Sequence, residues 1–589
     1  MVESGDSQVA APPKPAVPAL AHSLPLSSAA VFFASLLIQL LGVVASVALT
    51  KKIGLSEAGV TLLGTAQFFL LIGSSVNGLA DLRLGTAYTY FLARGKPPRD
   101  NTTTYLVVGM AMDAIAVIVL FVVAPLSVGG SALVYGTSEW FDLGLFLLLP
   151  ILWSFSGLYN SLFIGLGNSL KAQYPSLVES IVRLPVLVYV AFYWQSIEGI
   201  AVAYVIGAIS STLFSLPALL PQLGRFRWKE ATAMFRFSWP LMGSLFINYV
   251  VTNLTPFLVV TLSTAQLSIF LWANGWRILV LSLPAAVTTP LFPYLAGLHK
   301  TREFEALRRG TWQALRYSAM LLVPGVVALV TYRYNFLNVF ATGFYAGPGA
   351  LPLALLVIGA IPLALSQIIQ SAINSIGRQR LELYITSTQV AVLLVAVVIL
   401  LPPNGIFPVF YRLYPASLDP GLIAASVAIL LSSIAALALN TYFMETLIRV
   451  HLRPSPIAAI VVSAAGSFGS LWLLNHLHLF PVSNWYELLA AVLIGFTVYF
   501  LVLAAVGELT RADVRLIGHQ LGLPAWLYGP LARLCWRRTS PDLAPVDLSA
   551  ARGFQSAELP DTFTGTRELP DVAEITPDSE RVPPEGPKP

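Results

Sequence analysis

Charge and cysteine are both scarce in this chain. Of its 589 residues only 11% are charged, against about 25% in an ordinary soluble domain, while 56% are hydrophobic. The mean hydropathy is +0.75, and this composition excludes a soluble enzyme. The single cysteine, Cys535, excludes an intrachain disulfide and a cysteine cluster that holds a metal.

Several motifs of soluble chemistry are missing as well. The chain has no GxxxxGK[ST] phosphate loop, so ATP hydrolysis within it is not expected. Only His476 and His478 lie close together among six histidines, and we expect neither a metal site nor a cofactor. The net charge of +5 comes from basic residues scattered over short loops, which argues against nucleic acid as a partner.

What the sequence does contain is a series of apolar stretches long enough to cross a bilayer. About 20 apolar residues are needed to span roughly 30 Å of hydrocarbon as a helix. We predict fourteen membrane-spanning helices and an all-α fold. Their ranges are 27–50, 57–80, 103–126, 144–166, 173–194, 197–219, 238–262, 266–296, 317–334, 351–376, 381–401, 421–446, 456–475 and 486–506.

The distribution of basic residues predicts how these spans are oriented. The loops on the N-terminal side of the membrane hold most of the lysines and arginines, whereas the opposite loops hold only Lys51, Lys52, Arg333 and Arg412. Basic loops are retained on the cytoplasmic side. We therefore predict a multi-pass protein of the plasma membrane with both termini in the cytoplasm.

Small polar residues recur after a shift of about 209 to 210 positions, which indicates an internal duplication. Asn160 and Ser161 on the fourth span correspond to Gln370 and Ser371 on the tenth. Six spans per copy make the repeats parallel, so we predict two six-helix lobes around a central cavity, followed by two extra helices. The predicted parts are a disordered segment 1–26, an N-lobe 27–219, a cytoplasmic amphipathic connector 220–237, a C-lobe 238–447, the added spans 448–506, a basic segment 507–540 and a disordered acidic tail 541–589.

Polar stripes on the spans have two interpretations. Such side chains either bond neighbouring helices together, at about 0.6 kcal/mol each, or face water in a cavity. Their recurrence on four helices favours the cavity. The stripes are Ser35, Gln39, Gly42 and Ser46; Ser244, Asn248, Thr252 and Thr255; Ser176, Glu179, Ser180 and Arg183; and Gln367, Gln370, Ser371 and Asn374.

Four ionisable residues lie well within predicted spans, away from the span ends, where an unpaired charge costs about 2.5 to 3.5 kcal/mol. Glu179 and Arg183 are four residues apart and could neutralise each other. Asp113 stands alone, and so does Arg277, which has no acidic neighbour on its own span. A guanidinium suits phosphate or carboxylate, so Arg277 is the first candidate for an anion site; a bond to Asp113 or to a lipid headgroup is the alternative.

Four segments between residues 27 and 506 carry a resemblance to a known family. They are GLSEAG at 54–59, the basic segment 81–96, LFP at 291–293 and NSIGRQR at 374–380. In their order and spacing the chain resembles the polysaccharide and oligosaccharide-lipid flippases of the multidrug, oligosaccharidyl-lipid and polysaccharide exporter superfamily. Its first span carries no charge, unlike the peptidoglycan-precursor branch, whose first span typically has a cavity arginine.

The resemblance implies a flippase that moves a polyprenyl-diphosphate-linked glycan from the inner to the outer leaflet by alternating access. Its partners would be that glycan and membrane lipids, and could include other polysaccharide assembly proteins. Together with the polar stripes, it makes Asp113 and Glu179 candidates for ion coupling. The candidate substrate-binding residues are Arg277, Arg183, Asn274, Gln39, Asn248, Asn160, Gln367 and Gln370.

Two other functions remain open at the level of sequence. A multidrug or cation extruder of the same superfamily would use the intramembrane carboxylates. A membrane glycosyltransferase or polymer ligase would need acidic catalytic residues in outer loops, where Glu139, Asp142 and Asp419 are the available ones.

Overall fold

The computed structural model describes residues 24–93, 97–123, 137–166, 168–260, 263–300, 302–376, 378–400, 419–450, 454–477, 482, 484–510 and 514. All of them belong to a single compact unit, residues 1–546. The predicted disordered N-terminal segment lies outside the described residues except for its last three. The predicted tail 541–589 and nearly all of the basic segment 507–540 lie outside them as well.

The structure confirms an all-helical fold, with no strand among the described residues. All fourteen predicted spans coincide with helices, and twelve described helices are long and apolar enough to cross a membrane. The elements are α1 (Leu24–Lys52), α2 (Glu57–Ala80), α3 (Leu84–Ala93), α4 (Pro98–Val123), α5 (Thr137–Gly165), α6 (Ser169–Ala172), α7 (Tyr174–Tyr189), η2 (Val190–Trp194), α8 (Ile197–Leu219), η3 (Leu220–Gln222), α9 (Trp228–Val260), α10 (Thr264–Lys300), α11 (Phe304–Thr331), α12 (Arg333–Phe340), α13 (Gly343–Ser375), α14 (Gln379–Leu400), α16 (Pro420–Phe443), η5 (Met444–Ile448), α17 (Pro454–His476) and α18 (Trp485–Ala505).

Local sequence signals set several helix starts. Ser56 precedes α2 in extended conformation and its hydroxyl accepts a hydrogen bond from the Gly59 amide at 3.2 Å. Ser196 caps α8 in the same way, through Gly199 at 3.1 Å. Each cap satisfies one of the amide groups that have no partner in the first turn of a helix. The turn GLSEAG therefore fixes where the second span begins.

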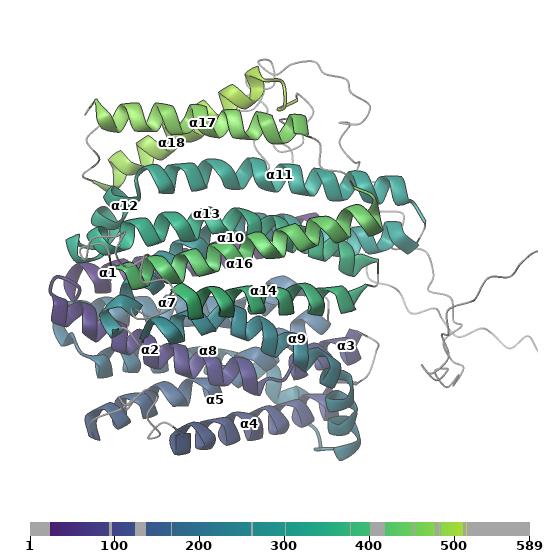
Figure 1. The fold of residues 1–589 in the computed structure, drawn as a ribbon. Coiled ribbons are helices and arrows are strands. Elements are labelled where there is room, and N and C mark those ends of the chain that lie inside the picture. Colours follow the sequence, from purple (N-terminus) through teal and green to yellow (C-terminus); the bar gives the residue numbers. More distant parts are fainter. Residues whose placement is uncertain are drawn as a thin grey trace, which may run out of the picture. The chain divides into compact units, whose positions relative to one another are not determined.

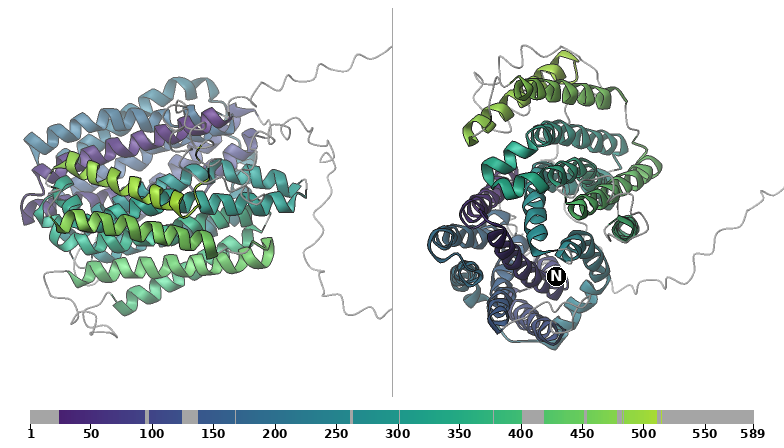
Figure 2. Two further views of the ribbon diagram at one scale, coloured as in Figure 1. Left: turned by 90° about the horizontal axis from the view of Figure 1, so that it is seen from above. Right: turned by 60° about the vertical axis from the view of Figure 1, so that its left-hand side comes forward.

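The long helices run side by side, with α3 at one end of the bundle and α12 at the other (Figure 1). In the end-on view, α17 and α18 lie at one edge (Figure 2). They pack on each other and on α11. The largest buried cluster draws residues from α2, α5, α8, α10, α13 and α16, and many of them are alanines that allow helices to approach closely.

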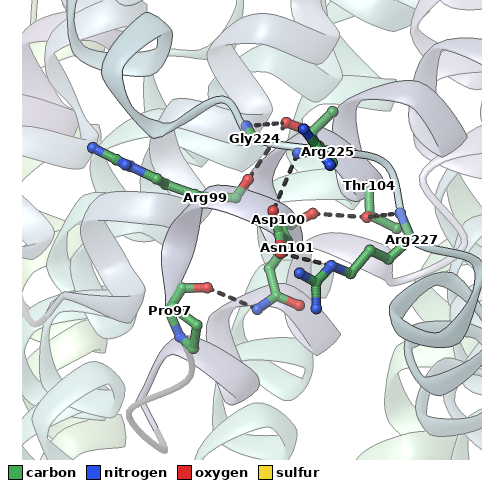
Figure 3. A network of polar contacts seen from close by, with 9 residues as sticks. Pro97, Arg99, Asp100, Asn101, Thr104, Gly224, Arg225 and Arg227 are labelled. Atoms are coloured by element: carbon green, nitrogen blue, oxygen red, sulfur yellow. Dashed lines mark hydrogen bonds and ion pairs between the residues drawn. The ribbon is translucent and has the colours of Figure 1, made fainter.

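The predicted connector 220–237 is held to the start of α4 (Figure 3). Asp100 accepts a hydrogen bond from the Arg225 amide at 3.1 Å, and its other oxygen pairs with Arg227 Nε at 2.7 Å. The Gly224 amide donates to Thr103 at 2.7 Å. The rest of the connector, from Trp228 onward, is helical, because α9 begins ten residues before the predicted seventh span.

A buried ion pair joins the end of α18 to α11. Arg316 Nε lies 2.7 Å from Glu508 Oε1, and a second nitrogen of the guanidinium donates to the Glu508 carbonyl. The Arg316 side chain is fully buried and that of Glu508 is 7% exposed. The two added spans are thus attached to the preceding helices by a polar contact as well as by apolar packing.

Candidate functional site

A polar cavity of about 480 Å³ lies between α2, α3, α4 and α5. We call it the N-terminal cavity. Two carboxylates, three amide or indole side chains and several hydroxyls face it, and the described residues of its lining include no lysine, arginine or histidine. The lining residues are Asn77, Asp81, Gly85, Thr86, Thr89, Tyr105, Leu106, Gly109, Asp113, Trp153, Ser154, Gly157, Asn160, Ser161 and Ile164.

Asp81 is placed by the turn that ends α2. The next two residues, Leu82 and Arg83, have φ of 45° and 59°, the left-handed region that non-glycine residues rarely adopt, and the chain then enters α3. Tyr105 donates to Asp81 Oδ1 at 2.9 Å and the Gly85 amide donates to the same atom at 3.3 Å. Burial raises the pKa of Asp81 above its usual value of 3.8, an effect that the Tyr105 hydrogen bond partly offsets.

Gly85 allows α3 to approach α5 at this point. A Cβ atom at position 85 would lie 2.8 Å from the Ser161 hydroxyl, 3.4 Å from the Tyr105 hydroxyl and 3.5 Å from Asp81 Oδ1. Any larger residue would therefore push into the hydrogen-bonded group. Glycine here is needed for close packing, since its φ is not in the left-handed region.

Asp113, a predicted ion-coupling residue, is 3% exposed and lines the same cavity. Its Oδ2 atom accepts a hydrogen bond from the Ser154 hydroxyl. Within the described part of the chain no donor contacts Oδ1, and the side-chain amides of Asn160 and Asn77 also have no partner. The structure therefore brings Asp113 and the predicted Asn160 together with Asp81, around unused hydrogen-bonding groups.

Glu179 and Arg183 form the predicted pair on α7, with Arg183 Nη1 2.8 Å from Glu179 Oε1. The guanidinium carbon lies 4.6 Å from the centre of the Tyr204 ring, on α8. Trp153, which lines the N-terminal cavity, lies close to Glu179, so this pair is near the wall of that cavity. Arg183 is thus neutralised by its own helix, and the intrahelical interpretation of the pair is confirmed.

Arg277 lies on α10 with only one side-chain partner among the described residues. Its Nη1 atom donates to Asn274 Oδ1 at 3.1 Å, while its Nε atom is buried and has no hydrogen-bond partner there. The expected alternative bond to Asp113 is not formed. Trp276, the residue before Arg277, packs edge-on against Phe336, with the two ring centres 4.3 Å apart. A buried nitrogen without an acceptor is costly, and an anion would relieve that cost.

Among the other predicted binding residues, those whose side chains are described do not line the N-terminal cavity. Gln370 donates to Thr386 at 3.5 Å, which joins α13 to α14. Gln367 is exposed, whereas the Gln39 amide oxygen is buried without a partner among the described residues. The side chain of Asn248 lies outside the described residues. These side chains are therefore not gathered into one described pocket, and their role in substrate binding stays a prediction.

At the end of the bundle opposite α3, the two predicted lobes are in contact. Trp272 Nε1 donates to the Thr50 hydroxyl at 2.9 Å, the Thr342 hydroxyl donates to the Gly54 carbonyl at 2.7 Å, and Lys51 Nζ donates to the carbonyl of Asn338 at 2.8 Å. We call this contact the closed end.

Gly64 lies at the same place. A Cβ atom there would lie only 1.8 Å from the Thr264 carbonyl oxygen, so α2 and the start of α10 nearly touch. The sequence predicted Lys51 as an outer-loop exception to the charge rule, and the structure places it in a bond between the two predicted lobes.

Sequence reasoning missed Asp81, Tyr105 and Gly85 as parts of a site. Asp81 was noted only as the first residue of a basic segment. An available signal is that Asp81 directly follows the apolar span 57–80, where burial of its carboxylate is expected to need a donor. Nothing in the sequence pointed to Tyr105 as that donor. Among the described residues, no group of three His, Cys, Asp or Glu is placed to hold a metal ion.

The comparisons with known proteins agree on the fold. The model of a family described as "Polysaccharide biosynthesis protein" matches residues 99–347. No curated protein sequence matches the chain. Among solved structures, the lipid II flippase MurJ in an inward closed conformation is 14% identical, with 82% of this chain and 99% of that one covered and a TM-score of 0.62.

Two multidrug transporters of the MATE family are also similar. One, in an inward-facing conformation and described as a member of the MOP superfamily, is 15% identical over 70% of this chain and 94% of its own, with a TM-score of 0.54. A variant of VcmN from Vibrio cholerae is 16% identical over 72% and 97%, with a TM-score of 0.51. Fold and family match together confirm that this chain resembles the exporters of the multidrug, oligosaccharidyl-lipid and polysaccharide superfamily.

Proposed function

We propose that this protein is a flippase that carries a lipid-diphosphate-linked oligosaccharide or polysaccharide precursor from the inner to the outer leaflet. The match to a polysaccharide biosynthesis family and the fold shared with a lipid II flippase support a lipid-linked sugar as the cargo. The transporter fold and the absence of a phosphate loop in the sequence support translocation without ATP hydrolysis by this chain.

Arg277 is the observation that carries the proposal. Its guanidinium is held on one side by Asn274 and retains a buried nitrogen with no acceptor among the described residues. A planar guanidinium can donate two parallel hydrogen bonds to phosphate oxygens. In our proposal the diphosphate binds Arg277, the polyprenyl chain stays in the bilayer, and Arg183 stays with Glu179.

Alternating access requires the closed end to separate. The three hydrogen bonds that cross it involve Thr50, Gly54 and Lys51 on the N-terminal side, and each contributes about 0.5 to 1.5 kcal/mol net. Contacts of this size can be broken and remade during transport. Residues 27–219 and 238–447 would then move as two lobes, with the closed end on the outer side in this conformation.

The membrane potential would favour export. If the cell interior is negative, moving one negative charge outward gains about 2.3 kcal/mol per 100 mV. A diphosphate with two negative charges would gain about twice that amount. Coupling to protons or sodium through Asp113 or Glu179 would add to this bias and is not required for the direction.

Charge reversal at Arg277 tests the proposal. We expect Arg277→Glu to insert normally but to abolish surface delivery of the glycan in cells that depend on this protein. The matched control is Arg309→Glu, which reverses an exposed charge on α11 and should keep near wild-type delivery. Wild-type delivery by Arg277→Glu would refute the anion site. Delivery lost equally in both variants would show that the effect is not specific to Arg277.

A second candidate is a multidrug extruder, which the MATE structures and the carboxylates of the N-terminal cavity favour. A cationic dye would bind those carboxylates, and the protein would then lower dye accumulation in cells. A glycan flippase should leave dye accumulation unchanged. Ethidium accumulation with and without the protein separates the two functions, and the Asp113→Asn variant would identify the site used.

A further inference from the structure

The N-terminal cavity contains polar groups that the protein itself does not satisfy. Asp113 lines the cavity and is only 3% exposed. In the described part of the chain, no donor contacts its Oδ1 atom. Asn77 and Asn160 contribute two amide side chains that likewise have no partner there. These polar groups face the open cavity, where they are available to bond a polar occupant.

We propose that the N-terminal cavity is a sugar-binding subsite, which takes a neutral or amine-bearing sugar ring of the transported glycan. This inference rests on the proposed function and adds to it the chemical class of the sugar. A second part of the cargo would thus be held by the first lobe, while the diphosphate is bound by Arg277.

The chemistry of the lining selects this ligand. Carboxylates accept hydrogen bonds from hydroxyl and ammonium groups, and amides both donate and accept. Because Asp81 and Asp113 face the cavity and its described lining contains no cationic residue, we expect a uronic acid or a phosphate to be repelled. Trp153 adds apolar surface for the C–H face of a sugar ring.

The size of the cavity agrees with a small polar ligand. Its volume of about 480 Å³ is within the roughly 300 to 1,000 Å³ of small-molecule sites. It is large enough for a monosaccharide unit with some remaining water, and too small for a long glycan. The cavity would therefore bind one part of the cargo.

The walls of the cavity are fixed in advance. Tyr105 and the Gly85 amide donate hydrogen bonds to Asp81, and the Ser154 hydroxyl donates one to Asp113. A site whose side chains are already oriented loses less conformational entropy on binding. This arrangement distinguishes the cavity from an unstructured gap between helices.

Gly109 offers a way to fill the cavity without disturbing its walls. A Cβ atom at this lining position would meet no atom within 4 Å, so Gly109→Leu places its side chain in open space. The matched control is Gly144→Leu on α5. A Cβ atom at position 144 also meets nothing within 4 Å, but Gly144 does not line the cavity. Both changes replace glycine by leucine within a helix of the same lobe.

The test is saturation-transfer NMR on the detergent-purified full chain, with glucose, glucosamine and glucuronate as probes. We expect transfer to glucose and glucosamine at millimolar concentration, and at least fivefold less to glucuronate. Gly109→Leu should abolish the transfer, whereas Gly144→Leu should retain it. Asp113→Asn should retain binding of glucose and remove any preference for glucosamine.

Three results would overturn the subsite: no transfer to glucose or glucosamine in the wild type, equal transfer to all three probes, or unchanged transfer in a folded Gly109→Leu variant. Circular dichroism and size-exclusion chromatography verify folding. Because the assay needs no transport, it is independent of the Arg277 experiment. Sugar binding without glycan delivery would contradict the flippase, and delivery without sugar binding would contradict only the subsite.

Discussion

The two predicted halves of the chain use corresponding polar positions differently. Asn160 in the first half lines the N-terminal cavity and has no partner among the described residues. Its counterpart Gln370 bonds Thr386, and Asn374, one turn further, donates to Glu382 at 2.6 Å. Thus one half keeps its polar groups available while the other uses them to join α13 to α14. The residue types at these corresponding positions are alike, and the neighbouring helix determines which bonds they form.

The two predicted halves also differ in how a buried charge is paired. Removing one member of a buried ion pair leaves the other uncompensated and typically costs about 3 to 5 kcal/mol. We expect Arg316→Ala to lower the free energy of unfolding by this amount, because Glu508 would remain buried. In the first half Asp113→Asn should be neutral or stabilising, since it removes a carboxylate that has no cationic partner in the described part of the chain.

Denaturant unfolding in detergent measures both effects, and a double variant controls for the first. Arg316→Met combined with Glu508→Leu removes both charges and should recover most of the stability lost in Arg316→Ala. A loss in the double variant as large as in the single one would show that the ion pair is not the cause.

The contact between the halves should be sensitive to size at Gly64. A side chain there would collide with the Thr264 carbonyl, and overpacking typically costs about 1 to 3 kcal/mol. We expect Gly64→Leu to open the closed end and to reduce glycan delivery at least tenfold. Gly42→Leu, where a Cβ atom meets nothing within 4 Å, should keep delivery.

A thiol probe reports the opening directly. Replacing Cys535, the only cysteine, by serine and introducing Thr50→Cys places one thiol at the buried closed end, where Thr50 is 1% exposed. An impermeant maleimide should label it from outside faster when Gly64→Leu is present. Equal labelling with glycine and leucine at position 64 would contradict the closed end.

A smaller effect separates the polar residues of α5 and α13. Asn374→Ala removes a hydrogen bond to a charged acceptor and should cost about 1.5 to 3 kcal/mol. Asn160→Ala removes no such bond and should change the free energy of unfolding by less than about 0.5 kcal/mol, while weakening sugar binding. Equal costs in thermal or denaturant unfolding would mean that the two halves do not differ as described.

The smallest effect is expected at the connector. Asp100→Ala removes the pair with Arg227, which is 62% exposed and therefore screened by solvent and salt. We expect a loss of at most about 1 kcal/mol, which high salt should reduce further. A loss unaffected by salt would assign the stability instead to the hydrogen bond from the Arg225 amide.

Much of the fold could be predicted because membrane spans are specified by length and apolarity. Every predicted span corresponds to a helix, and the short helices α3 and α12 were missed because ten and eight residues are too few to give that signal. The intrahelical pair of Glu179 and Arg183 was also predictable, because a separation of four residues places them on one face.

The N-terminal cavity was only partly predictable. Asp113 and Asn160 were identified individually, from a charge within a span and from a repeat. Their meeting with Asp81 and Tyr105 depends on the packing of four helices and on the turn at Leu82 and Arg83, which no periodicity reveals. For the same reason the sequence could not show that Gln370 bonds α14. A polar stripe that bonds a neighbouring helix and one that faces a water-filled cavity have the same spacing in the sequence.

Leaflet-resolved measurement of lipid-linked sugars after depletion of the protein tests the central claim most directly. The account predicts that full-length lipid-linked precursors accumulate on the cytoplasmic leaflet, and that they reach the outer leaflet again when wild-type protein, but not Arg277→Glu, is restored. Unchanged distribution between the leaflets after depletion would contradict the account.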